Sequence, residues 1–315
     1  MKVRHGFGPR GPDEPPTVVA VGTFAIVHRG HEVLLGRARD EAGRLGAVPA
    51  VVTFDHHPIE TLRPELALCR LATLEQRCEL LDAAGIVETL VIPFTEEVGF
   101  MTPEAFVRAA VLDGLRAAKV VVGEDFRFGH DRAGDVSTLQ DLGSRWGFEA
   151  ESVALVLGNG RKISSSDIRR MIGIGAVDEA AELIGRPYRL AGRVVHGDKR
   201  GRELGFPTAN LGSDERACLP ALGVYAARWR WRGRTIDGVV NVGVRPTFDD
   251  PATVKRPVVE IHIFDFAEDL YGQPGEIEFV ARIRDEIRFE SVDALVDRMH
   301  DDASRARRIL VGHRR

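Results

Sequence analysis

The 315-residue sequence has few cysteines and no long apolar run. The number of cysteines is odd, and their spacing is not that of metal ligands: Cys69, Cys78 and Cys218. We therefore expect reduced, buried thiols of a cytosolic protein. No apolar run approaches the roughly 18 residues of a membrane-spanning helix. The first residues, MKVRHGFGPRGPDEPP, lack an apolar core and a cleavage site, so we expect no secretory signal.

The sequence also lacks a strong charge of one sign. The formal net charge is −4, and the basic charge is nearly all arginine, scattered among acids. We therefore expect neither nucleic acid nor a membrane as partner. The composition, 44% hydrophobic and 29% charged, is that of a globular protein, and the length predicts about two domains. Nothing in the sequence indicates an oligomeric state.

The first half alternates apolar runs with segments of helical spacing. The expected strands are residues 17–22, 47–54, 88–94 and 118–123, and the expected helices are residues 31–46, 74–86 and 103–115. Apolar strands separated by amphipathic helices predict an α/β domain with a doubly wound parallel sheet. Ligands of such sheets bind beyond the carboxyl ends of the strands.

The second half has a different pattern. Two further helical segments end at Gly185, a predicted helix C-cap with Pro187 close behind. Alternating β-branched and aromatic runs then follow between Gly, Pro and Asp turns, which predicts a small antiparallel β-barrel closed by a terminal helix. We therefore expect domains at residues 1–185 and 186–315.

The segment VAVGTFAIVHRGHEVLLGRA, residues 19–38, places His28 and His31 at the start of a helix. Their spacing puts both imidazoles on one face of the first turn, beside the unpaired N–H groups that attract anions. Imidazoles there can bind a transferring α-phosphate and the departing pyrophosphate. Paired histidines near a helix start also occur by chance. The other expected nucleotide-binding residues of this turn are Gly22, Thr23, Phe24 and Gly30.

A second polar element is GRKISSSDIRR, residues 160–170. Ser164, Ser165 and Ser166 precede a helix that carries Arg169. One hydroxyl can simply cap the helix. Together with the arginine, the three can also bind the β- and γ-phosphates of a nucleotide.

The segment GRVVHGDKRGRELGFPTANL, residues 192–211, is a glycine-rich basic loop followed by a turn. Such a loop can wrap phosphates with backbone N–H groups. Thr208 and Asn210 suit a magnesium ion and a phosphate oxygen, or they cap the turn. The loop residues expected to bind nucleotide are Gly197, Lys199, Gly201 and Gly205.

The alternating run VVEIHIFDF, residues 258–266, predicts a strand whose polar face carries Glu260 and His262. A carboxylate directed into a cleft can accept the proton of an attacking primary hydroxyl. A solvated strand glutamate is the alternative.

These motifs together resemble the prokaryotic bifunctional riboflavin kinase/FAD synthetase family. In the first half, VVTFDHHP (51–58), VVVGEDFRFGHDRAGD (120–135) and ISSSDIRR (163–170) match family segments of an HxGH nucleotidyltransferase that transfers AMP from ATP to FMN. The resemblance implies that His28 and His31 bind the α-phosphate. It also implies that Arg169 and the serines bind the polyphosphate, and that Asp125 and Phe126 lie in the flavin and adenine region.

Two residues depart from the family turn, which usually reads Gly-Asn/Thr-Phe-Asp-Gly. Ala25 replaces an aspartate that would accept hydrogen bonds, and Ile26 replaces a glycine, which fits poorly if the turn needs a positive φ. Ser166 replaces a usual threonine and keeps the hydroxyl. The turn leaves open a slow adenylyltransferase, a changed nucleotide or flavin preference, or binding without turnover.

The second half resembles riboflavin kinase, a β-barrel that moves the γ-phosphate of ATP to riboflavin. The matching segments are GRVVHGDKRGRELGFPTANL, GVYAARW, VVNVGVRPTF, VEIHIFDF, DLYG and RIRDEIRF. The resemblance implies that Thr208 and Asn210 hold Mg–ATP, with the metal at Thr208, and that Glu260 is the catalytic base. The implied residues of the flavin-side flap are Arg284, Glu286 and Phe289.

The expected function is therefore a cytoplasmic, magnesium- and ATP-dependent enzyme that converts riboflavin to FMN in residues 186–315 and FMN to FAD in residues 1–185. One alternative is riboflavin kinase activity alone, with a first domain that is inactive or changed in specificity. A second is a flavin-binding regulatory protein without turnover.

Overall fold

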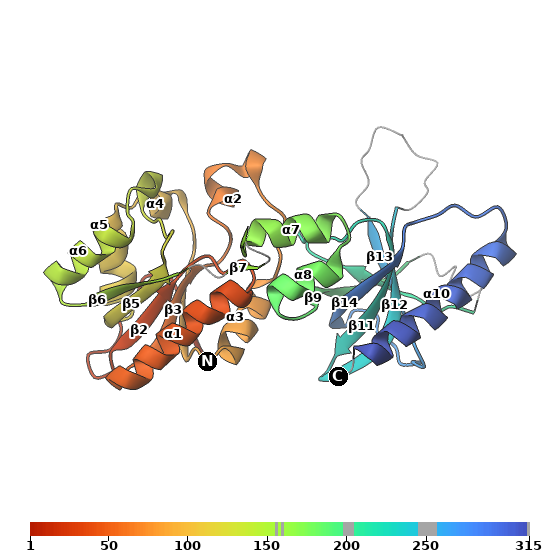
Figure 1. Ribbon diagram of the computed structural model, residues 1–315, viewed down its shortest axis with the longest axis horizontal. Helices are drawn as coiled ribbons and strands as arrows, with labels where there is room; N and C mark the ends of the chain where they lie inside the picture. The colour runs from red at the N-terminus through yellow and green to blue at the C-terminus, as the bar shows by residue number, and fades with distance from the viewer. Residues whose placement is uncertain (155–156, 159–160, 198–204, 245–256, 314–315) are drawn as a thin grey trace. The chain divides into compact units, whose positions relative to one another are not determined.

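The computed structural model describes residues 1–154, 157–158, 161–197, 205–244 and 257–313, and its chain divides into two compact units (Figure 1). The first unit consists of Met1–Leu68 and Thr73–Ser165, and the second of Cys69–Ala72 and Ser166–Arg315. The division differs from the expected boundary after residue 185, because α8 (Val177–Ile184) packs against barrel strands of the second unit. A domain boundary at residue 185 stays a prediction.

The first unit is built on a parallel sheet of six strands, in the order β1–β4–β3–β2–β5–β6. The strands are β1 (Lys2–His5), β2 (Thr17–Val21), β3 (Val48–Phe54), β4 (Glu88–Ile92), β5 (Ala117–Gly123) and β6 (Glu149–Val153). The doubly wound sheet is thereby confirmed, and β2 to β5 are the four strands that the apolar runs predict. The two outer strands, β1 and β6, were not predicted.

Helices cover both faces of this sheet. In β2, Val18 and Ala20 pack with α1, whereas Val19 and Val21 pack with the helical segments that precede β5 and β6. The helical segments of the first unit are α1 (Arg29–Leu45), α2 (Ile59–Leu62), η1 (Pro64–Leu66), α3 (Leu74–Ala83), α4 (Glu96–Gly99), α5 (Pro103–Phe106), η2 (Val107–Asp113), η3 (His130–Arg132) and α6 (Val136–Trp146). A small hairpin, β7 (Leu157–Gly158) and β8 (Arg161–Lys162), follows the sheet.

The strand order reverses at β2. β3 and β4 lie to one side of β2, and the chain then returns to place β5 on its other side. Loops from neighbouring strands diverge at such a switch point and leave a crevice beyond the carboxyl ends. Gly22 follows β2 and Gly123 ends β5, so the glycine-rich segments of the first half meet there.

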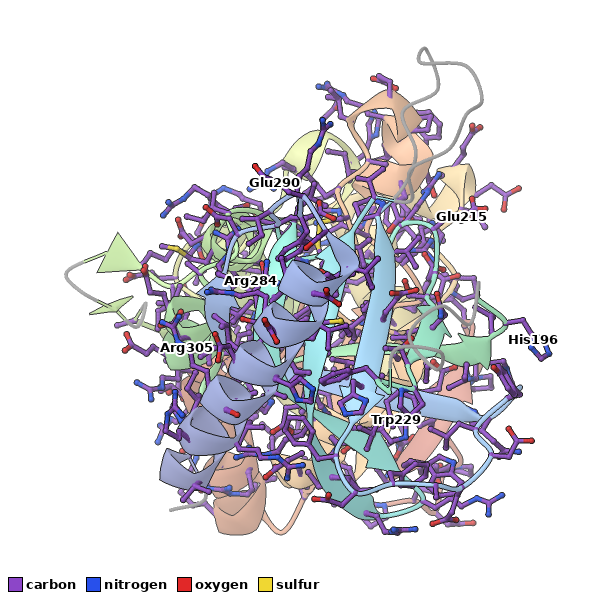
Figure 2. All side chains as sticks on the ribbon, turned by 90° about the vertical axis from the view of Figure 1, so that its right-hand side faces the viewer. His196, Glu215, Trp229, Arg284, Glu290 and Arg305 are labelled. Atoms are coloured by element: carbon purple, nitrogen blue, oxygen red, sulfur yellow. A yellow bond between two sulfur atoms is a disulfide. The ribbon has the colours of Figure 1, made fainter. Side chains whose placement is uncertain are left out.

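The second unit contains a closed antiparallel barrel, in the order β10–β13–β12–β11–β14–β9, which confirms the predicted barrel. Its strands are β9 (Tyr188–Val195), β10 (Ala209–Gly212), β11 (Gly223–Trp231), β12 (Arg234–Gly243), β13 (Val258–Ile263) and β14 (Pro274–Arg284). Before the barrel, α7 (Ser165–Gly173) is followed by α8, which ends at Gly185 with a φ of 90°, as its predicted C-cap role requires. Trp229 fills the barrel, and Arg284 lies beside the terminal helix α10 (Val292–Gly312) (Figure 2).

The expectation of three reduced thiols is wrong. Cys69 and Cys218 form a disulfide, and Cys78 is a free thiol. A short backbone pairing brings the two cysteines together, since Arg70 N–H donates to the Arg216 carbonyl at 2.6 Å and Cys218 N–H donates to the Arg70 carbonyl at 2.9 Å. Both segments belong to the second unit. A pairing between residues so far apart in sequence gives no local signal.

Candidate functional site

A cavity of about 340 Å³ lies at the switch point of the first unit, beyond the carboxyl ends of β2 and β5. Among its lining residues are Gly22, Thr23, Phe24, His28, Gly30, His31, Asp125, Phe126, Ser164 and Ser165. The structure therefore brings together ten residues that the sequence analysis singled out in three separate segments. This is the position at which doubly wound sheets bind ligands.

His28 and His31 form a stacked pair in the wall of this cavity, with ring centroids 3.7 Å apart. His28 is the N-cap of α1, and its Nδ1 accepts a hydrogen bond from the His31 backbone N–H at 3.3 Å. The Nδ1 of His31 lies 3.0 Å from the carbonyl oxygen of Ile26. Because a carbonyl only accepts, His31 carries its proton on Nδ1, whereas neutral His28 carries its proton on Nε2. The two Nε2 atoms therefore differ in protonation: neutral His28 carries a proton there and can donate, whereas neutral His31 does not and can only accept.

Burial sets the charge of this pair. Desolvation, with a smaller contribution from the positive charge of Lys162, lowers the pKa of His31 to about 4. The hydrogen bond to Ile26 opposes this shift without cancelling it. His31 is therefore neutral at pH 7 in the absence of a bound anion.

The turn between β2 and α1 has its strained residue at Phe24, with a φ of 41°, while Ile26 is buried at 4% exposure. The backbone of Ile26 does not have a positive φ, so a β-branched side chain is compatible with it. Gly22 and Gly30 make room for protein rings. A Cβ on Gly22 would lie 3.1 Å from the Phe24 ring, and one on Gly30 would lie 3.1 Å from the His28 ring.

Arg77 of α3 donates hydrogen bonds to this turn and to the end of β3, a role that the sequence analysis did not anticipate. Its guanidinium donates to Thr23 O at 3.0 Å, Thr53 Oγ1 at 2.6 Å, Phe54 O at 2.6 Å and Asp55 O at 3.1 Å. Burial lowers its pKa to about 10, so it remains charged at neutral pH. One buried cation thus fixes the loops after β2 and β3 relative to each other.

Three basic side chains line the cavity beyond those singled out from the sequence: Arg127, Arg132 and Lys162. Lys162 forms an ion pair with Asp125. Their positive charge favours a polyphosphate in this cavity. These three residues could have been singled out from the sequence, because all of them lie within or beside the segments GEDFRFGHDRAGD and GRKISSSDIRR.

Ser166 and Arg169 lie in the part of α7 that belongs to the second unit. The described lining of the cavity ends at Ser165. Arg169 donates from Nε to the carbonyl oxygen of Cys69 at 2.7 Å. Binding of the polyphosphate by these two residues stays a prediction.

In the second unit, Asn210, Glu260 and Asn241 lie side by side on three neighbouring strands. Asn210 of β10 pairs with Glu260 of β13, which in turn pairs with Asn241 of β12. Directly opposite residues of an antiparallel pair project from the same face. Val259 and Ile261, on the other face of β13, are each 1% exposed, so the three polar residues share the outer face of the barrel. We name Asn210, Glu260 and Asn241 the polar row.

Two glycines let further groups approach the polar row. A Cβ on Gly197 would lie 2.2 Å from Nδ2 of Asn210. A Cβ on Gly243 would lie 2.6 Å from Oε1 of Glu286 and 2.9 Å from Nδ2 of Asn241. Glu286, a predicted flap residue, therefore reaches the polar row. Asn241 was missed, although it stands in the quoted segment VVNVGVRPTF.

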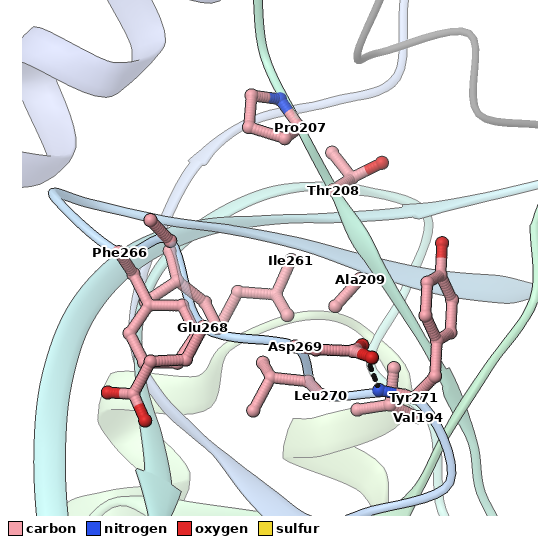
Figure 3. A pocket seen from close by; sticks show the side chains of 12 residues that line it. Val194, Pro207, Thr208, Ala209, Ile261, Phe266, Glu268, Asp269, Leu270 and Tyr271 are labelled. Atoms are coloured by element: carbon pink, nitrogen blue, oxygen red, sulfur yellow. Dashed lines mark hydrogen bonds between the residues drawn. The ribbon is translucent and has the colours of Figure 1, made fainter.

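A larger cavity of about 690 Å³ is lined by the other, apolar face of β10 and β13, which carries Ala209 and Ile261 (Figure 3). Thr208 is among its lining residues, and much of the remaining wall is apolar: Val194, Ala209, Ile261, Ile263, Phe266, Leu270 and Tyr271. In Figure 3, Phe266 and Tyr271 lie on opposite sides of the cavity, with Ala209 and Ile261 between them. An apolar cavity with aromatic walls suits a planar ring, and Thr208 offers a hydroxyl at its edge.

The remaining predicted residues have other surroundings. Arg284 pairs with Asp302 of α10, with Nε 2.8 Å from Oδ2, and its guanidinium lies 5.7 Å from the centre of the Phe289 ring. Arg284 thus joins the end of β14 to the terminal helix. Gly205 has a φ of 80°, a backbone conformation that favours glycine. Lys199 and Gly201 lie outside the described residues.

Comparison with known proteins gives matches over both units. Residues 11–167 match the family model of FAD synthetase, and residues 184–310 match that of riboflavin kinase. A bifunctional riboflavin kinase/FMN adenylyltransferase from Pseudomonas fluorescens is 37% identical over 307 residues, covering 98% of this chain and 97% of the relative. One of the same description from Listeria monocytogenes is 35% identical over 288 residues and covers 90% of both chains.

A solved structure with the same fold comes from Streptococcus pneumoniae. It has a TM-score of 0.86 and 31% identity, and the match covers 98% of this chain and 99% of that one. That protein is described as a macrolide-efflux protein. In the described part of the present chain, no helix has the length and apolar character to span a membrane.

Proposed function

The chain belongs to the bifunctional riboflavin kinase/FMN adenylyltransferase family, and we propose that each of its two units performs one of the two reactions. It is an enzyme of flavin biosynthesis. In the second unit, ATP phosphorylates riboflavin to FMN. In the first unit, ATP adenylylates FMN to FAD. The observation that carries the adenylylation is the stacked His28–His31 pair in the wall of the switch-point cavity.

In the first reaction centre, a phosphate oxygen of FMN attacks the α-phosphorus of ATP, and the bond to the bridging oxygen breaks to release pyrophosphate. The Nε2–H of His28 donates to an oxygen of the α-phosphate, where negative charge grows in the transition state. Arg127, Arg132 and Lys162 supply positive charge for the polyphosphate, and Ser164 and Ser165 supply hydroxyls. Positioning and charge stabilisation, without a covalent intermediate, account for the rate.

In the second reaction centre, Glu260 accepts the proton of the primary hydroxyl of riboflavin as the hydroxyl oxygen attacks the γ-phosphorus. The bond between the γ-phosphorus and the β–γ bridging oxygen breaks, and ADP leaves. Thr208 and Asn210 orient the phosphates, and the cavity that Thr208 also lines takes the adenine ring. The support for this assignment is the polar row, which sets a carboxylate between two amides.

Magnesium fits the oxygen atoms that these residues provide. The Thr208 hydroxyl and the Asn210 amide oxygen are hard ligands of the kind that Mg²⁺ prefers. The described residues contain no group of three or more His, Cys, Asp or Glu side chains that would hold a metal alone. Binding through the ATP phosphates with one or two protein oxygens is the usual arrangement for this ion. When bound, it would neutralise charge on the β- and γ-phosphates.

The test is to supply the protein with riboflavin and Mg–ATP, and separately with FMN and Mg–ATP, and to resolve the flavins by chromatography. We expect FMN and FAD from the first mixture and FAD from the second. Glu260→Gln should abolish FMN formation and leave FAD formation from added FMN intact. His28→Ala should do the reverse. Each variant thereby uses the other unit as its control for folding.

Accumulation of FMN without FAD would contradict the adenylylation, and the second mixture would then be repeated with CTP and GTP. No consumption of riboflavin would contradict the kinase and leave flavin binding without turnover. Both reactions consume ATP, which supports the expected cytoplasmic location.

A further inference from the structure

His262 lies on β13 two residues after Glu260, so both side chains lie on the same face of the strand. Its Nδ1 is 2.9 Å from the carbonyl oxygen of Pro207, the residue directly before Thr208. Since that carbonyl can only accept, His262 donates from Nδ1. The hydrogen bond therefore connects the turn that carries Thr208 to the strand that carries Glu260.

This connection begins where the strand pairing ends. The β10–β13 ladder pairs Asn210 with Glu260 and Ala209 with Ile261. Continuing the register by one residue sets Thr208 opposite His262, but β10 starts only at Ala209. The hydrogen bond from His262 thus holds the first residues beyond the ladder, which the sheet itself leaves unpaired.

Aromatic packing also contributes to the position of this turn. The ring of Phe206, which is 5% exposed, lies 5.1 Å from the His262 ring and 4.7 Å from the His300 ring of α10, both edge to face. His300 therefore supports Phe206, while among these two histidines it is His262 that contacts the Pro207 carbonyl.

We propose that His262 is a positioning residue of the kinase site, which fixes Thr208 relative to Glu260. The inference rests on the proposed roles of these two residues. Phosphoryl transfer depends on the alignment of ATP with the attacking hydroxyl, so a shift of the Thr208 turn lowers the rate even when both reacting groups are present. His262 itself does not contact the reacting atoms in this proposal.

The experiment compares His262→Asn with His262→Gln. An asparagine amide reaches about as far as Nδ1 of histidine and can donate to the Pro207 carbonyl, whereas a glutamine amide reaches about as far as Nε2. We expect kcat/KM for Mg–ATP to fall about tenfold in His262→Gln and His262→Ala, the loss of one well-placed hydrogen bond, and to stay within about threefold in His262→Asn. The KM for riboflavin should remain unchanged.

Three controls separate positioning from general damage. FAD formation from FMN in the same protein reports folding of the other unit, and His300→Ala removes a Phe206 contact but keeps the hydrogen bond. In a Thr208→Ala background, His262→Ala should lower the phosphorylation rate little further. In this proposal both changes act on the same contribution, the placement of the Thr208 hydroxyl. Equal losses in the Asn and Gln variants, or a rise in the riboflavin KM alone, would overturn the proposal. Full activity of Thr208→Ala alone would instead contradict the assigned role of Thr208.

Discussion

The carbonyl oxygen of Ile26 lies 3.0 Å from Nδ1 of His31. Ile26, one of the two residues that depart from the usual family turn, thus orients a histidine of the site through its backbone. Because every residue has a backbone carbonyl, this contact with His31 does not depend on the side chain at position 26. Ile26 is 4% exposed and packs in the interior.

The first prediction concerns this turn. Restoring the usual residues, as Ala25→Asp with Ile26→Gly, should not raise the rate of FAD formation by more than about twofold, because the histidine orientation is already in place. Ile26→Gly alone should lower the free energy of unfolding by about 3 kcal/mol, since it removes a buried side chain. Chromatography of the flavins and thermal unfolding measure the two effects. A large gain in FAD formation would mean that the natural turn is impaired.

The second prediction follows from the low pKa of His31, about 4. In the unfolded chain a histidine has a pKa near 6.5. Between these two pKa values the unfolded state binds more protons than the folded state. The free energy of unfolding should therefore fall as the pH drops from about 6.5 to 4. Below pH 4 this contribution should no longer change. His31→Gln should reduce this slope, which denaturant unfolding at several pH values measures. An unchanged slope would show that His31 is accessible to protons when folded.

A further part of the second prediction is that the pKa of His31 should change when ATP binds. The negative charge of a bound triphosphate favours the protonated imidazole and raises its pKa. Binding near pH 6 should therefore take up a proton, which titration calorimetry in two buffers of different ionisation enthalpy detects. The uptake should be lost in His31→Gln. Proton release, or none in the natural protein, would contradict this coupling.

The sequence predicted the inner strands of the first unit and the barrel, but not β1 and β6. The inner strands are continuous apolar runs, and β2 is buried at every position. The outer strands, KVRH and EAESV, are largely polar and have exposed or partly buried residues, so neither period nor hydropathy marks them. Their pairing comes from the neighbouring strand.

His28, His31 and Glu260 could be singled out from the sequence because each stands in a recognisable motif, and their catalytic roles stay predictions. The neighbours of these residues could not be singled out. Arg77 contacts carbonyl groups of two loops distant in sequence, and Asn241 lies next to Glu260 only through the strand register. Both relationships arise only from the folded backbone.

The third prediction tests the approach of Glu286 to the polar row. In Gly243→Ala, the new methyl group would lie 2.6 Å from Oε1 of Glu286 and 2.9 Å from Nδ2 of Asn241, too close for either. We expect riboflavin phosphorylation to fall about tenfold or more while FAD formation from FMN persists. Gly312→Ala, whose added carbon would have no described atom outside its own helix turn within 4 Å, is the matched control and should keep both activities. Unchanged phosphorylation in Gly243→Ala would show that Glu286 does not need this position.

The fourth prediction concerns the disulfide between Cys69 and Cys218, which are 149 residues apart. Alkylation of the unfolded, unreduced protein should modify Cys78 alone, and prior reduction should expose all three thiols, as mass spectrometry would show. A cross-link that closes so long a loop restricts the unfolded chain, so reduction should lower stability by about 4 kcal/mol and reduce the Tm.

Cys69→Ser with Cys218→Ser should match the reduced protein and no longer respond to reductant. Cys78→Ser should keep the full response, since its thiol takes no part in the bond. The carbonyl of Cys69 accepts the hydrogen bond from Nε of Arg169. Opening the disulfide should therefore also loosen Arg169, and FAD formation should change more than FMN formation if Arg169 binds the polyphosphate. Three alkylated thiols without reduction would contradict the disulfide itself.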